Sequence, residues 1–469
     1  MLSTDFTFYF CAAIIFVVFY TVRSPVLQTI VLGLGSFAMY ATEGGGFLLL
    51  LIANTALTAV CSFVVAARNA VYSRLALVAG IVINLAVLAT FKYDRLLLPL
   101  LRHNPPDWMR ELLAFGLPIG ISFYTFHGIS LMVDCWHNPD IVRRRDHLLN
   151  HCIDTALYLS FFPQLVAGPI TKGRMFFPQI VIKRFGEIPW AEAVSGIIVG
   201  FFLKRVIADN LNELTLPLTD SRTYAGTPQY ELLAMVIGYS AQIFADFAGY
   251  SLIAIGVAQL FGYQLPANFN QPYLAQSITD FWRRWHMSLS AWLKEYLYFP
   301  LGGNRRGAAR TYLNLLIVMG LGGLWHGADW KFAVWGLWHG GLLAVERFLG
   351  IGEPSPGPIA VARVMLTFFL VTVGWLFFRL NSLNDVGLLL HEFSLPWRPL
   401  DATRTGHTDA VTIYVLCAAV LLFHLPISSI GISYWAKRSK ILWPMFLGFL
   451  VAVVLMASGS RHAFIYFQF

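Results

Sequence analysis

Two histidines within an apolar stretch are the residues best suited to chemistry. Segment 321–340 reads LGGLWHGADWKFAVWGLWHG, and both His326 and His339 lie in the sequence Gly-Leu-Trp-His-Gly. An ionisable residue at membrane depth is costly, so it usually has a function. The flanking glycines allow another backbone or a ligand to approach closely, and Trp325 and Trp338 offer flat aromatic walls. We expect His326 to lie in a tunnel through a membrane.

The chemistry that such a histidine supports is general-base catalysis. Taking a proton from a substrate hydroxyl needs a base, and histidine suits this role at neutral pH. Desolvation between glycines and apolar walls favours the neutral imidazole that a base requires. Backbone N–H groups near Gly322, Gly323 and Gly327 are candidate donors to the developing oxyanion. The alternative is a structural histidine in the protein core. For His339, the sequence supports this structural role as well as it supports a functional one.

A third histidine, His286, lies in a belt of aromatic and basic residues, 264–310, which contains FWRRWHMSLSAWLKEYLYFPLGGNRRG. Ser277 and Asp280 predict the start of a helix. Helical spacing then places four residues on one face: Phe281, Trp285, Ser288 and Trp292. We expect this helix to lie at the membrane interface, with its tryptophans among the lipid headgroups.

Basic residues of the same belt could bind an anionic ligand. Arginine and lysine beside flexible glycine backbone suit a phosphate-bearing molecule. The residues predicted to bind such a ligand or to line the tunnel are Arg283, Arg284, Asn304, Arg305, Gly323, Trp325 and Gly327. The alternative is ordinary positively charged sequence on the cytoplasmic side of a membrane.

The composition predicts an integral membrane protein. Of 469 residues, 57% are hydrophobic and 12% charged, whereas about 25% of a soluble domain is charged. A net charge of +8 indicates basic cytoplasmic loops, and no nucleic-acid-binding motif is present. Five cysteines without CxxC spacing are typical of buried apolar residues. We also expect no bound metal and no permanently bound cofactor. The N-terminal apolar run lacks a signal-peptide pattern and predicts a retained span.

Apolar segments of roughly 20 residues are needed to cross a bilayer as helices. The sequence predicts on the order of eleven full spans and one or two partial ones. The candidate segments are 5–20, 25–40, 47–67, 75–91, 112–136, 154–170, 191–208, 232–261, 312–325, 331–349, 361–378, 411–430 and 441–457. Several are short or broken by glycine, which suits a fold with a cavity at mid-membrane.

Individual residues refine this prediction. Pro118 and Gly120 predict a kink in segment 112–136, and the Gly168-Pro169 pair predicts a re-entrant or broken helix. Lys204-Arg205 are expected to end segment 191–208, and Asp246 to interrupt segment 232–261. Two basic runs, Arg143–Arg145 and 437–440, indicate cytoplasmic loops.

Five segments between 117 and 340 resemble the membrane-bound O-acyltransferase (MBOAT) family, in particular its bacterial branch of alginate O-acetyltransferase membrane proteins and their cellulose-acetylating relatives. They are LPIGISFYTF, FFPQLVAGPI, FADFAGYS, NFNQPYLAQSITDFWRRWHMSLSAWLKEYLYFPLGGNR and GGLWHGADW. The resemblance implies an all-α polytopic membrane protein of one domain, 1–469. It further implies re-entrant and interfacial helices around a central funnel or tunnel.

The resemblance also implies a function. Family members bind an acyl donor from the cytoplasm, normally acetyl-coenzyme A, and transfer the acyl group outward, here across a bacterial inner membrane. The catalytic histidine of the Trp-His-Gly motif matches His326, and a second polar position matches His286. The acceptor stays open: alginate and cellulose are both plausible, and peptidoglycan less so. A periplasmic acetyltransferase and a polysaccharide synthase or secretion complex are the expected partners, besides membrane lipid.

The aromatic C-terminal tail, 461–469, is a further candidate site. It resembles the aromatic tail of small partner peptides in teichoic-acid D-alanylation, which the same family serves. On this basis Tyr466 is a candidate acyl carrier that takes acetyl at His326. The alternative is a packing tail or membrane anchor.

Two other functions fit parts of the sequence. A transporter or channel would account for Asp246 and the glycine-broken helices, but the two halves of the chain show no matching hydropathy. A non-catalytic scaffold of a polysaccharide synthase would tolerate the loss of His326.

Overall fold

The computed structural model describes residues 6–67, 69–93, 116–143, 147–351, 354–399, 405–424 and 440–457, and every element within these ranges is a helix. The all-α prediction is therefore confirmed for the described residues. The chain divides into two compact units. Unit 1 comprises Met1–Val194 and Ile253–Pro266, and unit 2 comprises Ser195–Leu252 and Ala267–Phe469. A single domain over the whole chain stays a prediction.

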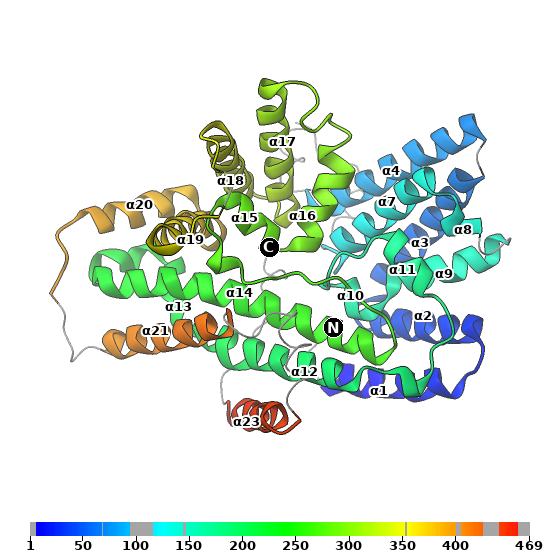
Figure 1. Cartoon of the computed structure of the whole chain (residues 1–469), viewed down its shortest axis with the longest axis horizontal. Helices are drawn as coiled ribbons and strands as arrows, with labels where there is room; N and C mark the ends of the chain where they lie inside the picture. Colours follow the sequence, from blue (N-terminus) through cyan, green and yellow to red (C-terminus); the bar gives the residue numbers. More distant parts are fainter. Residues whose placement is uncertain are drawn as a thin grey trace. The chain divides into compact units, whose positions relative to one another are not determined.

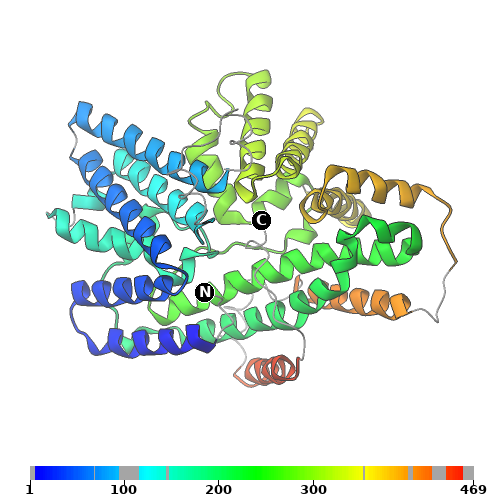
Figure 2. The same ribbon diagram turned by 180° about the vertical axis from the view of Figure 1, so that it is seen from behind.

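Unit 1 is a helical bundle in which α3 packs against α4, α7 and α9, and α2 against α1 and α9 (Figures 1 and 2). Its helices are α1 (Phe6–Thr21), α2 (Pro25–Ala41), α3 (Gly45–Ala66), α4 (Ala70–Lys92), α7 (Ile121–His137), α8 (Asp140–Arg143), α9 (Leu148–Ser160), α10 (Phe162–Leu165), α11 (Gly173–Phe176), η2 (Phe177–Gln179) and η3 (Phe185–Glu187).

The predicted kink near Pro118 is instead the start of a helix. Gly120 is the N-cap of α7 and has φ 77°, a left-handed conformation that glycine adopts without strain. A Cβ on Gly120 would lie 2.5 Å from the Leu165 carbonyl oxygen. The close approach of these two backbones therefore requires glycine and fixes where α7 begins.

The predicted broken helix at 154–170 is confirmed. α9 ends at Ser160, the single turn of α10 follows, and the chain continues through Gly168 and Pro169 without regular structure while staying buried. Tyr158 holds this segment, because its hydroxyl donates to the Thr171 carbonyl oxygen at 2.7 Å. Irregular backbone is tolerated at membrane depth where protein surrounds it.

Unit 2 contains fourteen further described helices: η4 (Phe202–Ala208), α13 (Asp209–Thr215), η5 (Leu216–Thr219), η6 (Ser221–Gly226), η7 (Pro272–Leu274), α15 (Ile278–Arg284), α16 (Met287–Leu293), η8 (Lys294–Tyr298), α17 (Ala308–His326), α18 (Trp330–Phe348), α19 (Gly357–Arg379), α20 (Leu383–Ser394), α21 (Thr405–His424) and α23 (Leu442–Met456). Two helices continue from one unit into the other, α12 (Trp190–Phe201) and α14 (Gln229–Leu260).

Four described helices are long and apolar enough to cross a membrane: α3, α4, α14 and α19. Four shorter apolar helices join them, namely Thr7–Thr21, Pro25–Ala41, Asp409–His424 and Leu442–Met456. Large apolar side chains are exposed along several of them, including Met365, Phe369 and Leu422. These surfaces fit a multi-pass membrane protein, whereas a count of about eleven spans stays a prediction.

Charged residues do not break the helices of unit 2 where the sequence predicts. α14 runs without interruption through Asp246. Lys204 and Arg205 do not end a helix either, because they lie inside the π-helix η4, which continues directly into α13. Both predictions fail because each charge has a buried partner of opposite sign, described below.

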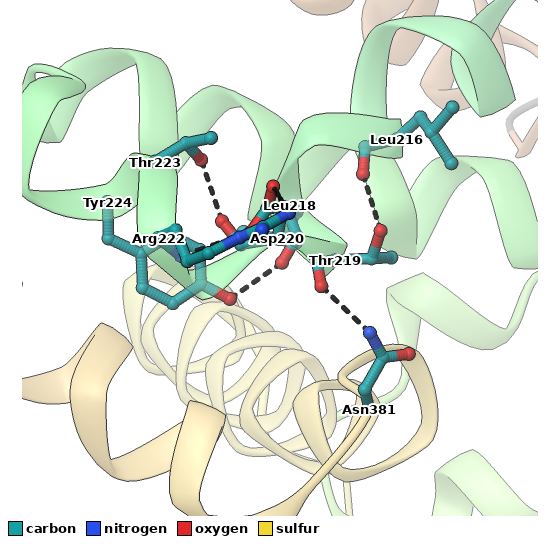
Figure 3. Close-up of polar contacts among 8 residues, drawn as sticks. All are labelled: Leu216, Leu218, Thr219, Asp220, Arg222, Thr223, Tyr224 and Asn381. Carbon is teal, nitrogen blue, oxygen red and sulfur yellow. Dashed lines mark hydrogen bonds and ion pairs between the residues drawn. The ribbon is translucent and has the colours of Figure 1, made fainter.

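α20 packs against η6 over an apolar cluster that includes Leu218, Tyr224 and Leu389. Figure 3 shows the polar contacts at this end of unit 2, where Asn381 donates to the Thr219 carbonyl oxygen at 2.9 Å. Arg222 binds Asp220 at 2.8 Å, and its guanidinium lowers the pKa of that carboxyl.

Candidate active site

The repeated Gly-Leu-Trp-His-Gly sequence forms the contact between α17 and α18, which pack side by side as a hairpin (Figure 1). A Cβ on Gly323 would lie 2.1 Å from the Phe332 carbonyl oxygen, and one on Gly336 would lie 2.1 Å from the Met319 carbonyl oxygen. No real side chain fits at such distances, so the two glycines let the helix backbones touch. The repeat therefore supplies one contact glycine to each helix.

His326 is the last residue of α17 and is 4% exposed. Its ring lies 5.0 Å from Trp325, 5.1 Å from Trp335 and 5.3 Å from Phe378, measured between ring centroids. Because the glycine contact fixes α17 against α18, it also fixes His326 against Trp335. The imidazole is thus held in an aromatic, water-poor setting.

His286 breaks the helix that the sequence predicts as continuous. It has φ 41°, between the end of α15 and the start of α16. The turn is held by Asn268, whose carbonyl oxygen accepts from the Met287 N–H at 2.9 Å and whose Oδ1 accepts from the Ser288 hydroxyl at 2.6 Å. A left-handed non-glycine residue costs about 1–3 kcal/mol and persists only where such contacts impose it.

The predicted common face of this belt is nevertheless buried, as Phe281, Trp285, Ser288 and Trp292 are each at most 6% exposed. A position of Trp285 and Trp292 among lipid headgroups is therefore wrong. Both tryptophans pack inside the protein, where Trp285 contacts Phe281 and Trp375 and Trp292 contacts Tyr296.

Trp325 brings the two predicted catalytic histidines together. Its ring centroid lies 6.1 Å from that of His286 and 5.0 Å from that of the adjacent His326. Phe247 of α14 also packs against His286, with ring centroids 4.6 Å apart and an edge-to-face arrangement. Two buried imidazoles around one indole can accept, hold and return a proton in a site that excludes water.

Comparison with known proteins identifies the family. A model of the membrane-bound O-acyltransferase (MBOAT) family matches residues 121–352. The "Probable alginate O-acetylase AlgI" of Pseudomonas aeruginosa is 37% identical over 445 residues, which cover 90% of this chain and 81% of that protein. The chain belongs to the MBOAT family. It is therefore an acyltransferase.

Two other MBOAT relatives are similarly close. The protein of the same name from Azotobacter vinelandii is 38% identical over 73% of this chain and 68% of its own length. The "Peptidoglycan O-acetyltransferase" of Helicobacter pylori is 32% identical over 95% of this chain and 92% of its own length. The region matched by the family model contains both His286 and His326.

The two glycines predicted to line the MBOAT tunnel make protein contacts. Gly323 touches the backbone of α18, and a Cβ on Gly327 would lie 2.1 Å from the ring of Phe332. The Gly327 N–H donates to the Leu324 carbonyl oxygen at 3.2 Å, so it is already engaged and is a poor oxyanion donor. The tunnel-lining role of these glycines stays a prediction.

The predicted donor-binding residues lie at the surface of unit 2. Arg283, Asn304 and Arg305 are exposed, and half-buried Arg284 binds Asp280 at 2.8 Å. The Asn314 side-chain amide donates to the Gly303 carbonyl oxygen at 3.0 Å and thereby holds the basic turn. The turn is thus ordered, and its arginines face outward.

His339 contacts Trp335, the same ring that contacts His326. It is fully buried, its centroid is 5.1 Å from Trp335 and 5.2 Å from Trp282, and its ring is nearly parallel to Phe281. Among the described residues, neither ring nitrogen has a hydrogen-bond partner. These contacts are those of a core aromatic residue.

Sequence reasoning missed two charged contacts of unit 2. The Glu346 carboxylate accepts from the Thr279 N–H and hydroxyl, both at 2.9 Å, and so caps the start of α15. Lys204 binds Asp246 at 2.6 Å. In the sequence, each contact was visible only as an unexplained charged residue in an apolar segment. The partner could not be identified, because it is distant in the sequence.

Several predictions fall outside the described residues. They concern Tyr466, the tail 461–469 and most of the two basic runs, 143–145 and 437–440. The role of Tyr466 and the orientation of the chain stay predictions. Within the described ranges, no group of three or more His, Cys, Asp or Glu residues is arranged to hold a metal ion.

Proposed function

We propose that this MBOAT acyltransferase transfers acetyl groups from acetyl-coenzyme A, bound from the cytoplasm, to a polysaccharide outside a bacterial inner membrane. The observation that carries the proposal is the pair of buried histidines, His286 and His326, packed around Trp325. The names of the relatives, alginate O-acetylase and peptidoglycan O-acetyltransferase, support an acetyl group and a saccharide acceptor.

In this reaction His326 is the general base. Its neutral imidazole takes the proton of the attacking hydroxyl as the oxygen bonds to the acetyl carbonyl carbon. The carbon–sulfur bond then breaks, and the imidazolium returns the proton to the coenzyme A thiolate. His286, whose ring also contacts Trp325, is proposed to stabilise the charged intermediate, so that both histidines are needed for full rate.

The donor is proposed to dock on the exposed basic belt. Arg283 and Arg305 present guanidinium groups to solvent beside Asn304, which suits the phosphates of coenzyme A. Acetyl-coenzyme A is then a substrate and no cofactor is permanently bound. Trp325 is proposed to line the path of the thioester.

Transfer to the outside needs an acceptor at the far end of the site. Tyr466 is proposed to serve as an acyl relay, whose phenolic oxygen would receive acetyl and then pass it on. A periplasmic acetyltransferase and a polysaccharide synthase or secretion complex are the proposed partners, because the final acceptor is a polymer that they make or hold.

The test compares the O-acetyl content of secreted and wall polysaccharides between wild type and H326A at equal abundance in the membrane. Acetylation should disappear in H326A. The matched control is H391A, which alters an exposed histidine of α20 and should retain wild-type acetylation. Full acetylation by H326A would instead support a scaffold or a transporter.

Peptidoglycan is a second candidate acceptor, because the Helicobacter pylori relative aligns with 95% of this chain. Measuring O-acetyl groups separately on alginate, cellulose and peptidoglycan of the same cells distinguishes the acceptors. Only the true acceptor should lose its acetyl groups in H326A. Y466F in the same assay tests the relay, which full acetylation would rule out.

A further inference from the structure

Unit 2 contains a buried cluster of four charges that the acyl-transfer mechanism does not use. The Lys204 ammonium lies 2.6 Å from an Asp246 oxygen and 3.0 Å from an Asp209 oxygen, and Arg205 binds Asp209 at 2.5 Å. The side chains of Lys204, Asp209 and Asp246 are at most 6% exposed. Two cations and two carboxylates balance, so the cluster offers no net charge to a ligand.

Stability alone is a weak reason to keep such a cluster. Replacing a buried ion pair by apolar residues is often neutral or stabilising, whereas removing one partner is strongly destabilising. Ionisable residues in membrane-spanning helices usually mark a functional element. Asp246 lies in α14, one of the four helices able to cross a membrane.

Lys204 contacts α14 through its backbone as well as through its ammonium group. A Cβ on Gly249 would lie 3.0 Å from the backbone nitrogen of Lys204 and 2.7 Å from the Gly200 carbonyl oxygen. The glycine thus lets the backbone of α12 and η4 press against α14, one turn beyond Asp246. The ion pair and the glycine contact together fix the position of α14 along its own axis.

The same stretch of α14 holds the His286 turn. Phe247, next to Asp246, contacts the His286 ring at 4.6 Å. One turn later, the Ser251 hydroxyl accepts from the Asn268 amide at 3.0 Å, and Asn268 in turn binds Met287 and Ser288. A shift of α14 would therefore move both the wall and the anchor of the left-handed turn.

We infer that the buried Lys204–Asp246 ion pair positions His286 for catalysis by fixing α14. Neither residue touches substrate, and the pair acts through Phe247, Ser251 and Asn268. The functional part of this inference rests on the proposed acetyl transfer, while the structural part, that the pair holds the His286 turn, does not.

The test uses the full chain in membrane vesicles with labelled acetyl-coenzyme A. D246N should retain at least half of the wild-type abundance and a KM for acetyl-coenzyme A within about twofold, but lose on the order of 100-fold in kcat, the cost of misplacing a catalytic group by about 1 Å. The neutral double variant K204M/D246L should recover at least about tenfold over D246N, because an apolar contact can restore helix position.

Hydrogen exchange of the same proteins gives a readout that does not need activity. Exchange at the Met287 amide should rise about tenfold in D246N while the amides of the α17–α18 hairpin keep their protection. D220N, which removes an exposed carboxylate of unit 2, is the matched control and should change neither quantity.

Three outcomes would overturn the inference. The first is wild-type kcat per inserted D246N molecule, which leaves the pair a role in stability only. The second is unchanged exchange at Met287. The third is a double variant as impaired as D246N, which would assign the effect to charge. If the wild type shows no acetyl transfer, the proposed function fails, and hydrogen exchange alone still decides whether the pair holds the turn.

Discussion

Trp325, Trp335 and Phe378 give His326 a setting in which its position is set by ring contacts. A neutral imidazole among aromatic rings keeps its basic nitrogen unsolvated, so the proton of an incoming hydroxyl meets little competition from water. The proposed role of His326 as a base therefore depends on these neighbours. The glycines of the α17–α18 contact hold those neighbours in place.

G323A tests that contact. The new methyl group would meet the Phe332 carbonyl oxygen, so the two helices must separate, at a cost of about 1–3 kcal/mol. Thermal unfolding in detergent should therefore occur at lower temperature, and acetyl transfer should fall.

The control is G341A, in the same hairpin, where a Cβ would have no neighbour within 4 Å. It should be neutral or stabilising by up to about 1 kcal/mol, because alanine favours helix more than glycine does. Equal unfolding temperatures for G323A and G341A would refute the close contact.

H286A and H286G separate the backbone of the turn from the imidazole. Both variants lose the ring, so transfer should fall to the same low level in each. Glycine accepts a left-handed conformation freely, whereas alanine pays about 1–2 kcal/mol. H286G should therefore be the more stable of the two by denaturant titration, and the reverse order would show that the turn relaxes when the ring is removed.

At the scale of elements, α20 shows how a short helix is fixed in unit 2. Ser382 and Asp385 form a capping box, with the Asp385 N–H donating to the Ser382 hydroxyl at 3.2 Å. The pKa of Asp385 is lowered, first by its hydrogen bond to Ser221 and then by those to Ser382. The ionised carboxylate therefore joins α20 to η6.

D385A should loosen α20 by about 1 kcal/mol, the usual value of a lost cap. Because the folded-state pKa is below the unfolded value near 3.9, this contribution is present above that value and is lost as pH falls through the folded pKa. Hydrogen exchange of α20 should thus differ between wild type and D385A at pH 7 and converge in acid. The control is N384A, which alters an exposed residue of the same helix. An equal change in N384A would show that the effect does not come from the loss of the cap.

The sequence allowed the apolar helices and the broken segment at 154–170 to be predicted, because both follow from local composition. It did not reveal the break at His286, because that turn is imposed by Asn268 from another segment. Nor could it pair Lys204 with Asp246, since complementary charges do not specify a contact. The glycine repeat was visible, but its role as a helix contact required both helices.

At the scale of the whole molecule, the membrane topology decides which side of the bilayer each end of α14 faces. α14 is long enough to cross the bilayer, and 78% of its most apolar 18-residue stretch is buried inside the protein. Its N-terminal end comes after η6 in the chain, and its C-terminal end comes before the basic belt. If α14 spans and the belt is cytoplasmic, then Arg222 and Arg305 lie on opposite sides of the membrane.

Single cysteines at these exposed positions test the arrangement in a chain whose five native cysteines are replaced by serine. In intact spheroplasts, an impermeant maleimide should label R222C and spare R305C. Inverted vesicles should show the opposite pattern. The cysteine-free parent is the control, and labelling of both positions from one side would exclude α14 as a full span.

The left-handed backbone at His286 also limits what natural variation can do at this position. Few side chains tolerate such a conformation, and apart from glycine these are asparagine, aspartate and histidine. Relatives that have lost the histidine but kept the turn should therefore carry glycine or a small polar amide or acid there, and not a branched or bulky apolar residue. In descendants of this fold, any side chain that acts from this position should thus be one that can form hydrogen bonds, whichever acceptor the protein has come to serve.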